Sequence, residues 1–145
     1  KGYLPLAQTN MQGLEAWMRQ NPSKLAEVLG QNPSYVFFRT TTGAADEGPI
    51  GALGAPLTGE YSAAIDKHHV ELGAPIFVAT THPLNNQPHN RLIMAQDTGS
   101  AIKGGVRVDY YWGYGDAAGE VAGKMKHPGQ VWMLLPNGYT PRYQP

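Results

Sequence analysis

Two aspartates at the ends of apolar, strand-like segments are the residues of this sequence best placed to do chemistry. Asp97 follows the apolar run 92–96, Asp109 follows the run 106–108, and a glycine-rich bend separates them. Strands that end side by side bring such side chains together at the rim of a sheet or barrel. Carboxylates held in this way act as general acids and bases. Carboxylate chemistry is therefore our first functional hypothesis.

Residues 97–100 form the tetrapeptide Asp-Thr-Gly-Ser, which is also typical of aspartic proteases. In those enzymes two copies of the motif meet, so that two carboxylates share one proton. This chain has a single copy. A dimerising subunit would also need a hydrophobic-hydrophobic-glycine segment late in the chain, and residues 134–138 have proline where that glycine should be. An aspartic protease is therefore the least favoured interpretation.

Composition limits the classes of partner and site. The 145 residues are sufficient for one domain of ordinary size, with a small additional element. Eleven basic residues balance eleven acidic ones, so no net charge attracts nucleic acid or an anionic membrane surface. The absence of cysteine excludes disulfides and thiolate zinc sites. His68 and His69 would point to opposite faces of a strand, so we predict neither a metal site nor a cofactor.

The order of predicted elements places the aspartates on a mainly β fold. Residues 8–30 show a helical pattern that is interrupted at Asn21-Pro22-Ser23, and residues 40–48 are polar and predict a loop. A helix is expected at 116–124, with Asp116 as its N-cap. Short strands rich in β-branched and aromatic residues are predicted at 35–38, 49–52, 63–66, 76–79, 92–96, 106–111 and 131–135. Such strands separated by glycines favour a small closed barrel.

Three aspartates in their local settings make a more specific pattern than the tetrapeptide. Asp66 follows Ala64-Ile65, Asp97 precedes Thr98-Gly99-Ser100-Ala101-Ile102-Lys103-Gly104, and Asp109 precedes Tyr110-Tyr111-Trp112-Gly113. This pattern resembles the three-aspartate (3D) domain. Residues 31–38, the preceding helices, and the tail from 113 to 136 are similar to the membrane-bound lytic murein transglycosylase A family, so the resemblance covers essentially the whole chain.

The resemblance implies a fold and a domain organisation. The expected fold is a six-stranded double-psi β-barrel over residues 49–145. Residues 1–48 would be a helical segment and linker that belong to a second, groove-forming domain. Members of the family are longer, so we expect an N-terminal part of the same enzyme, possibly present as a separate chain, to complete the barrel.

The resemblance also implies an activity and a set of site residues. Family members cleave the bond between N-acetylmuramic acid and N-acetylglucosamine in peptidoglycan and form a 1,6-anhydromuramyl end. Asp109 matches the catalytic acid, and Asp97 and Asp66 would supply negative charge near it. The glycines of the bend between the aspartates, Gly99, Gly104 and Gly105, would let the backbone approach the glycan and offer it N–H groups. The substrate-binding residues expected there are Gly99, Ser100, Ala101, Lys103 and Gly104.

Several alternatives stay open at this stage. Lys103 and Arg107 could oppose the charge of the aspartates or could bind the N-acetyl and lactyl groups of the sugar. A non-catalytic peptidoglycan-binding module with the same fold is the alternative function. The family would place the protein in the Gram-negative periplasm, associated with the outer membrane only through a lipidated N-terminus that this sequence lacks, with a peptidoglycan glycan strand as its partner.

Overall fold

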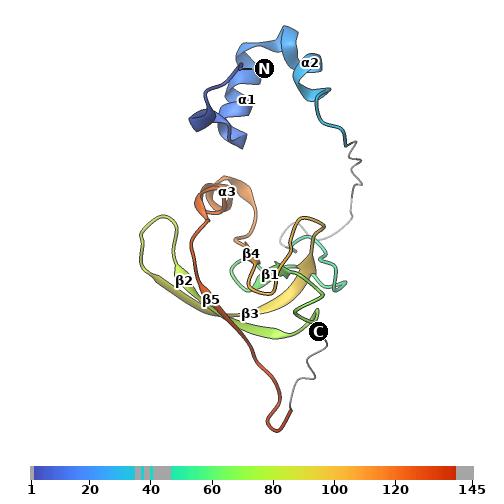
Figure 1. Ribbon diagram of the computed structural model, residues 1–145, viewed down its shortest axis with the longest axis vertical. Helices are drawn as coiled ribbons and strands as arrows, with labels where there is room; N and C mark the ends of the chain where they lie inside the picture. The colour runs from blue at the N-terminus through green and yellow to red at the C-terminus, as the bar shows by residue number, and fades with distance from the viewer. Residues whose placement is uncertain (1, 35–36, 38–39, 41–46, 140–145) are drawn as a thin grey trace. The chain divides into compact units, whose positions relative to one another are not determined.

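The computed structural model describes residues 2–34, 37, 40 and 47–139 (Figure 1). The chain divides into two compact units, residues 1–42 and 43–145. The strand predicted at 35–38 lies outside the described residues except for Phe37, and most of the loop predicted at 40–48 lies outside them as well. No helix in the described parts of the chain has the length and apolar character needed to cross a membrane.

The first unit is helical, as predicted. It contains the 3₁₀ helix η1 (Leu6–Gln8), helix α1 (Met11–Gln20), the 3₁₀ helix η2 (Pro22–Lys24) and helix α2 (Leu25–Leu29). The side chain of Asn10 caps α1 by accepting a hydrogen bond from the Gly13 N–H at 2.8 Å. The interruption predicted around Pro22 separates α1 from α2, because proline favours the first turn of a new helix.

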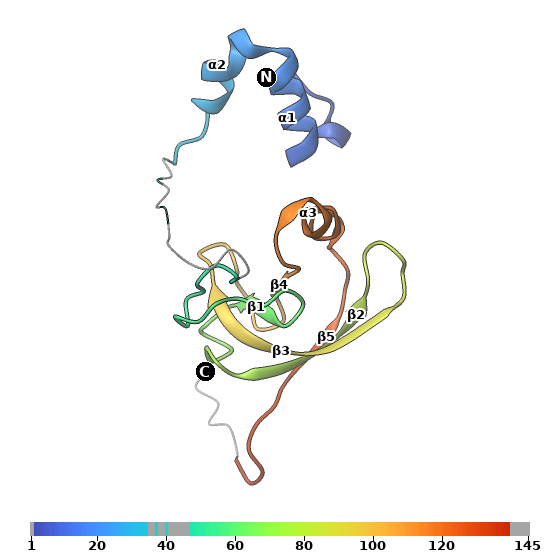
Figure 2. The ribbon, with the colours of Figure 1, turned by 180° about the vertical axis from the view of Figure 1, so that it is seen from behind.

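The second unit is built on a mixed sheet of five strands in the order β4-β1-β3-β2-β5 (Figures 1 and 2). The strands are β1 (Ser62–Ile65), β2 (Pro75–Thr81), β3 (Pro88–Thr98), β4 (Val108–Tyr111) and β5 (Gln130–Met133). Strand β1 runs parallel to β3, and the other pairs are antiparallel. Five predicted strands are thereby confirmed. Among the described residues the sheet is open, with β4 and β5 at its edges, so a closed six-stranded double-psi barrel stays a prediction.

The strand predicted at 49–52 is wrong. Ile50 forms a single antiparallel bridge with Pro56, and the residues between them make a tight turn. The Gly51 N–H donates to the Ala55 carbonyl at 3.0 Å, and Gly54 has a φ of +82°, which favours glycine. A Cβ atom on Gly51 would lie 2.5 Å from the Gln96 carbonyl oxygen, so the turn crosses β3 closely. This turn, residues 50–56, replaces the expected strand.

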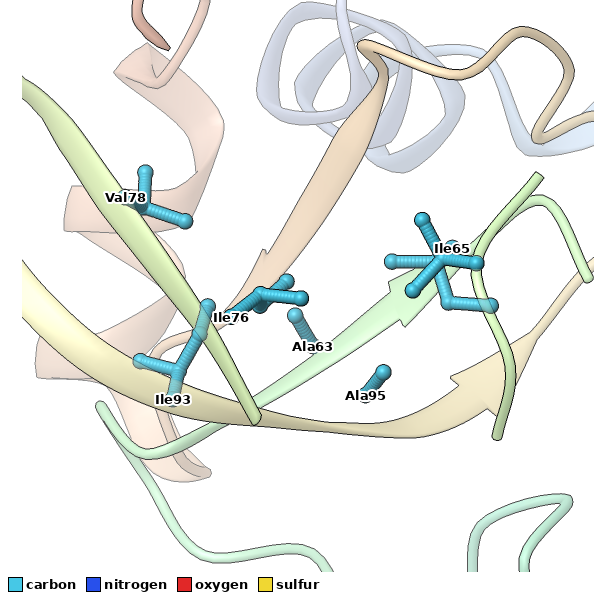
Figure 3. Packing of buried hydrophobic residues seen from close by; sticks show 7 residues of the cluster. Ala63, Ile65, Ile76, Val78, Ile93 and Ala95 are labelled. Carbon is cyan, nitrogen blue, oxygen red and sulfur yellow. The ribbon is translucent and has the colours of Figure 1, made fainter. Parts of the chain in front are cut away.

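One face of the sheet carries the hydrophobic core. Ala63, Ile65, Ile76, Ile93 and Ala95 are at most 1% exposed, and they come from the three central strands (Figure 3). Alternate residues along β1, β2 and β3 point to this face because successive side chains of a strand point to opposite sides. Partly buried hydrophobic residues pack around the cluster, namely Leu72, Ala74, Val108, Tyr110, Val131 and Met133.

Helix α3 (Gly115–Lys124) confirms the helix predicted at 116–124. The predicted N-cap is wrong, since Tyr114 occupies that position and Asp116 lies in the first turn. A carboxylate is favourable at the N-cap and in the first turn alike, because negative charge near a helix N-terminus interacts favourably with the helix dipole. Asp116 is exposed, and its position accounts for it without a functional role.

Candidate active site

Two of the three aspartates occupy one row of the sheet. Asp97 on β3 and Asp109 on β4 both pair with Ala64 on β1, which lies between these strands. Because neighbouring strands lie about 4.8 Å apart, the two aspartates are separated by roughly 10 Å along the backbone row. Each of the two carboxylates has its own hydrogen-bond partner, the Ala52 N–H for Asp97 and Arg107 for Asp109.

Asp66 lies one residue after the end of β1 and is buried, with 5% of the residue exposed. Its carboxylate accepts hydrogen bonds from the Gly104 N–H at 2.9 Å and the His68 N–H at 3.1 Å. The first of these bonds, followed by the second, lowers the pKa of Asp66 from 3.8 to about 2. His69 Nδ1 lies 3.4 Å from the same carboxylate. Asp66 therefore anchors the bend between Asp97 and Asp109.

This depressed pKa predicts an acid-sensitive contribution to stability. Between pH 2 and about pH 4 the unfolded chain binds more protons at this position than the folded chain. Asp66 thus stabilises the fold above about pH 4, and the contribution is lost as the pH falls through 2. We expect Asp66→Asn to lower the denaturant concentration at the midpoint of unfolding near neutral pH. As the pH falls, the midpoint of this variant should decrease less than that of the wild type. Chemical denaturation across this pH range measures the effect.

Asp116→Asn is the matched control, because Asp116 is an exposed aspartate in the first turn of α3. It should keep the acid decline of the wild type. An unchanged acid decline in Asp66→Asn would show that the Gly104 and His68 hydrogen bonds do not hold this carboxylate in its charged form.

Asp97 is held by the turn 50–56. Its Oδ1 accepts a hydrogen bond from the Ala52 N–H at 2.9 Å. The register of β1 against β3 shifts between Ala63 and Ala64, so that Asp97 rather than Gln96 pairs with Ala64. Such a bulge is a frequent device for redirecting a side chain at the end of a strand. Segment 49–52, which was predicted as a strand, therefore supplies a backbone hydrogen-bond donor to Asp97.

Asp109 is partly exposed and is bound by one arginine. Arg107 donates from Nε to Oδ1 at 2.9 Å and from Nη2 to Oδ2 at 3.0 Å. The hydrogen bond to Asp109 raises the pKa of Arg107 above its ordinary value. Asp109 also lines a pocket of about 470 Å³ together with Trp112, Met125 and His127. Of the two cations left open by the sequence, the structure thus pairs Arg107 with Asp109.

The bend expected to bind substrate joins β3 to β4. Ser100, Ala101 and Lys103 are exposed on it, whereas Ile102 is buried and fixes it to the unit. The Gly104 N–H donates to Asp66, so in this state it is not a free donor for a glycan. Gly104 has a φ of +102°, a backbone conformation that residues with a side chain rarely adopt. Lys103 lowers the pKa of Asp66 through its charge, after the hydrogen bonds named above.

A cluster of rings beside Asp109 was not predicted as a unit. Tyr110 and Trp112 lie 4.7 Å apart between ring centroids, and His89 lies within 5.2 Å of both. The Tyr110 hydroxyl donates to the Glu60 carbonyl oxygen at 2.5 Å and contacts His89 Nε2 at 3.0 Å. Burial raises the pKa of Tyr110 to about 12 and lowers that of His89. The available signal was the aromatic run that begins at Tyr110 on β4 and continues to Trp112, just beyond the end of that strand.

No group of three or more histidine, aspartate or glutamate side chains in the described part of the chain is arranged to hold a metal ion.

Comparison with family models supports the sequence resemblance. The 3D domain model matches residues 61–135, which include all three aspartates, and the MltA specific insert domain model matches residues 1–39. The membrane-bound lytic murein transglycosylase A of Escherichia coli (strain K12) is 35% identical over 141 residues, covering 92% of this chain and 37% of that protein. The Vibrio cholerae protein of the same name is 33% identical, with the same coverage.

Solved structures support the same family assignment as the sequence comparisons. The monoclinic crystal structure of MltA from Neisseria gonorrhoeae is 67% identical with a TM-score of 0.89, and the match covers 99% of this chain and 36% of that one. The crystal structure of E. coli MltA with bound chitohexaose is 33% identical with a TM-score of 0.75, covering 90% and 39%. The chain thus spans well under half the length of these relatives. It belongs to the membrane-bound lytic murein transglycosylase A family and carries the 3D domain of that family.

Proposed function

We propose that this chain carries the catalytic carboxylate of a peptidoglycan lytic transglycosylase. The observation that carries the proposal is Asp109, which lines a pocket and shares a row of the sheet with Asp97 inside the region matched by the 3D domain. The names of the relatives and the chitohexaose bound to one of them support a glycan substrate. In this proposal the bond that is cleaved is the one between N-acetylmuramic acid and N-acetylglucosamine.

In the proposed reaction Asp109 acts first as an acid and then as a base. Protonated Asp109 gives its proton to the glycosidic oxygen as the bond from C1 of the muramyl residue to that oxygen breaks. The hydroxyl on C6 of the same sugar then attacks C1, and Asp109 takes up its proton. The new C1–O6 bond closes the 1,6-anhydro ring, no water is consumed, and Asp109 returns to its starting state.

The other residues have supporting roles in this proposal. Asp97, about 10 Å along the row, stabilises the positive charge that develops on the sugar ring in the transition state. Asp66 keeps the bend in place through Gly104, so that Gly99, Ser100, Ala101 and Lys103 lie along the glycan. Its hydrogen bonds to the backbone favour this anchoring role over direct participation.

We further propose that activity requires the N-terminal part that the longer relatives carry. Within the described residues, the open edges at β4 and β5 leave strand hydrogen-bonding groups available for further pairing. A sixth strand from that part would close a double-psi barrel over residues 49–145, and residues 1–48 would belong to a second, groove-forming domain. The words membrane-bound in the name of the relatives support a place in the cell envelope. We propose the Gram-negative periplasm, with attachment to the outer membrane by a lipidated N-terminus. This chain joined to that part is called the complete protein below.

The proposal is tested by incubating the complete protein with purified murein sacculi and identifying the soluble products by mass spectrometry. Anhydromuropeptides are the expected products. Reducing muramyl ends would make the protein a hydrolase. Binding to sacculi with no release of fragments would make it a peptidoglycan-binding module, the alternative function.

A further inference from the structure

Arg107 makes three hydrogen bonds that join two parts of the candidate site. Two of them go to the two oxygens of Asp109, at 2.9 and 3.0 Å. The third runs from Nη1 to the carbonyl oxygen of Ala101, at 2.7 Å. The planar fork of an arginine fits both oxygens of a carboxylate at once and fixes their orientation. Arg107 therefore bridges Asp109 and the bend between the aspartates.

The bend to which Arg107 is hydrogen-bonded is itself held in place. Ile102, next to Ala101, is 7% exposed and packs into the unit, and its N–H donates to the Gly99 carbonyl at 3.0 Å. Gly104 is tied to Asp66 at 2.9 Å. The side chains of Arg107 and Asp109 are themselves 48% and 44% exposed, so the protein does not confine them by packing. Hydrogen bonds to the fixed bend are what orient the carboxylate.

We infer that Arg107 is a positioning residue for Asp109, which orients the carboxylate against the bend and releases one of its oxygens when the glycosidic bond enters. The inference rests on the proposed function of Asp109. Each of the two guanidinium N–H groups occupies one lone pair of a carboxylate oxygen, so opening one of these bonds frees that lone pair to carry a proton towards the glycan. The bond from Arg107 to Ala101 can persist during this release, so the arginine stays in place for the next cycle.

Other charged and titratable groups lie around the same pocket. Lys126 and His127 line it from the segment after α3, and Tyr110 follows Asp109 on β4. Arg107 is the group that contacts both carboxylate oxygens in the described structure. Removing its planar fork should therefore change the orientation of Asp109.

Steady-state kinetics of the complete protein on a soluble glycan fragment tests this inference. Arg107→Gln should lower kcat about 10- to 100-fold, the effect of misplacing a reacting group, with KM changed less than about threefold. Arg107→Lys keeps the charge and loses the fork, so it should also lower kcat with little change in KM.

Lys124→Gln is the matched control. It removes another exposed cation–carboxylate pair, to Glu120 on α3, and should change neither kcat nor KM. If Arg107→Gln matches the wild type in kcat and in KM, Arg107 does not position Asp109, while the activity of the wild type still supports the proposed function. If the wild type forms no anhydro product, the proposed function is wrong, and the positioning role is wrong with it.

Discussion

Asp109→Asn is expected to lower the rate of anhydromuropeptide release by the complete protein by about a thousandfold or more, the upper range for loss of a general acid–base group. Asparagine keeps the size of the side chain and can still accept hydrogen bonds from Arg107. It cannot give a proton to the glycosidic oxygen or take one from the hydroxyl on C6. Release from sacculi, followed by chromatography and mass spectrometry, measures the effect.

Two comparisons make the Asp109 result specific. Asp97→Asn should reduce release less, about tenfold to a hundredfold, because Asp97 stabilises charge without transferring a proton. Asp116→Asn removes an exposed carboxylate on α3 and should leave release unchanged. Wild-type release by Asp109→Asn would place the acid elsewhere. Equal losses for Asp97 and Asp109 would contradict the separate roles given to them.

Ile93→Ala is expected to lower the free energy of unfolding by about 2–5 kcal/mol, the range for truncating a buried aliphatic side chain. Ile93 is 1% exposed and lies in the core cluster between β1 and β2 (Figure 3). The truncation removes transfer free energy and leaves a cavity that the surrounding strands cannot fill. Denaturant unfolding of the complete protein, monitored by fluorescence and by circular dichroism, measures the loss.

Leu92→Ala is the control for that prediction. Leu92 is the neighbour of Ile93 on β3, points to the other face of the sheet, and is 51% exposed. Truncating it should lower the free energy of unfolding by less than about 1 kcal/mol. A loss as large as that of Ile93→Ala would show that the face of the sheet carrying Leu92 is also buried in the complete protein.

Local patterns in the sequence were sufficient to predict most elements. Short runs rich in β-branched and aromatic residues, separated by glycines, predicted five of the strands, and α3 forms where a helix was expected at 116–124. Segment 49–52 failed because the apolar residues there belong to a tight turn. That turn depends on Gly54 and on the close approach of Gly51 to the Gln96 carbonyl. Contacts with a strand more than 40 residues away leave no periodic signal in a short segment.

In the candidate site, too, local sequence identified individual residues but not the contacts between residues that are far apart in the chain. The aspartates could be named from their settings, but the pairing of Asp97 and Asp109 with Ala64 depends on strand order. The anchoring of the bend by Asp66 joins residues 38 positions apart. The contact between Arg107 and Asp109 was easier to predict from the sequence, because both residues lie in the predicted strand 106–111 and residues two apart on a strand point to the same face.

The most direct test of the central claim is to digest sacculi with the complete protein in water labelled with heavy oxygen and to measure the label at the new muramyl ends. Intramolecular attack by the hydroxyl on C6 takes no oxygen from the solvent, so we predict unlabelled 1,6-anhydro ends whose formation is lost in Asp109→Asn. One labelled oxygen at each new reducing end would show that water attacks C1, and would contradict the transglycosylase mechanism proposed for Asp109.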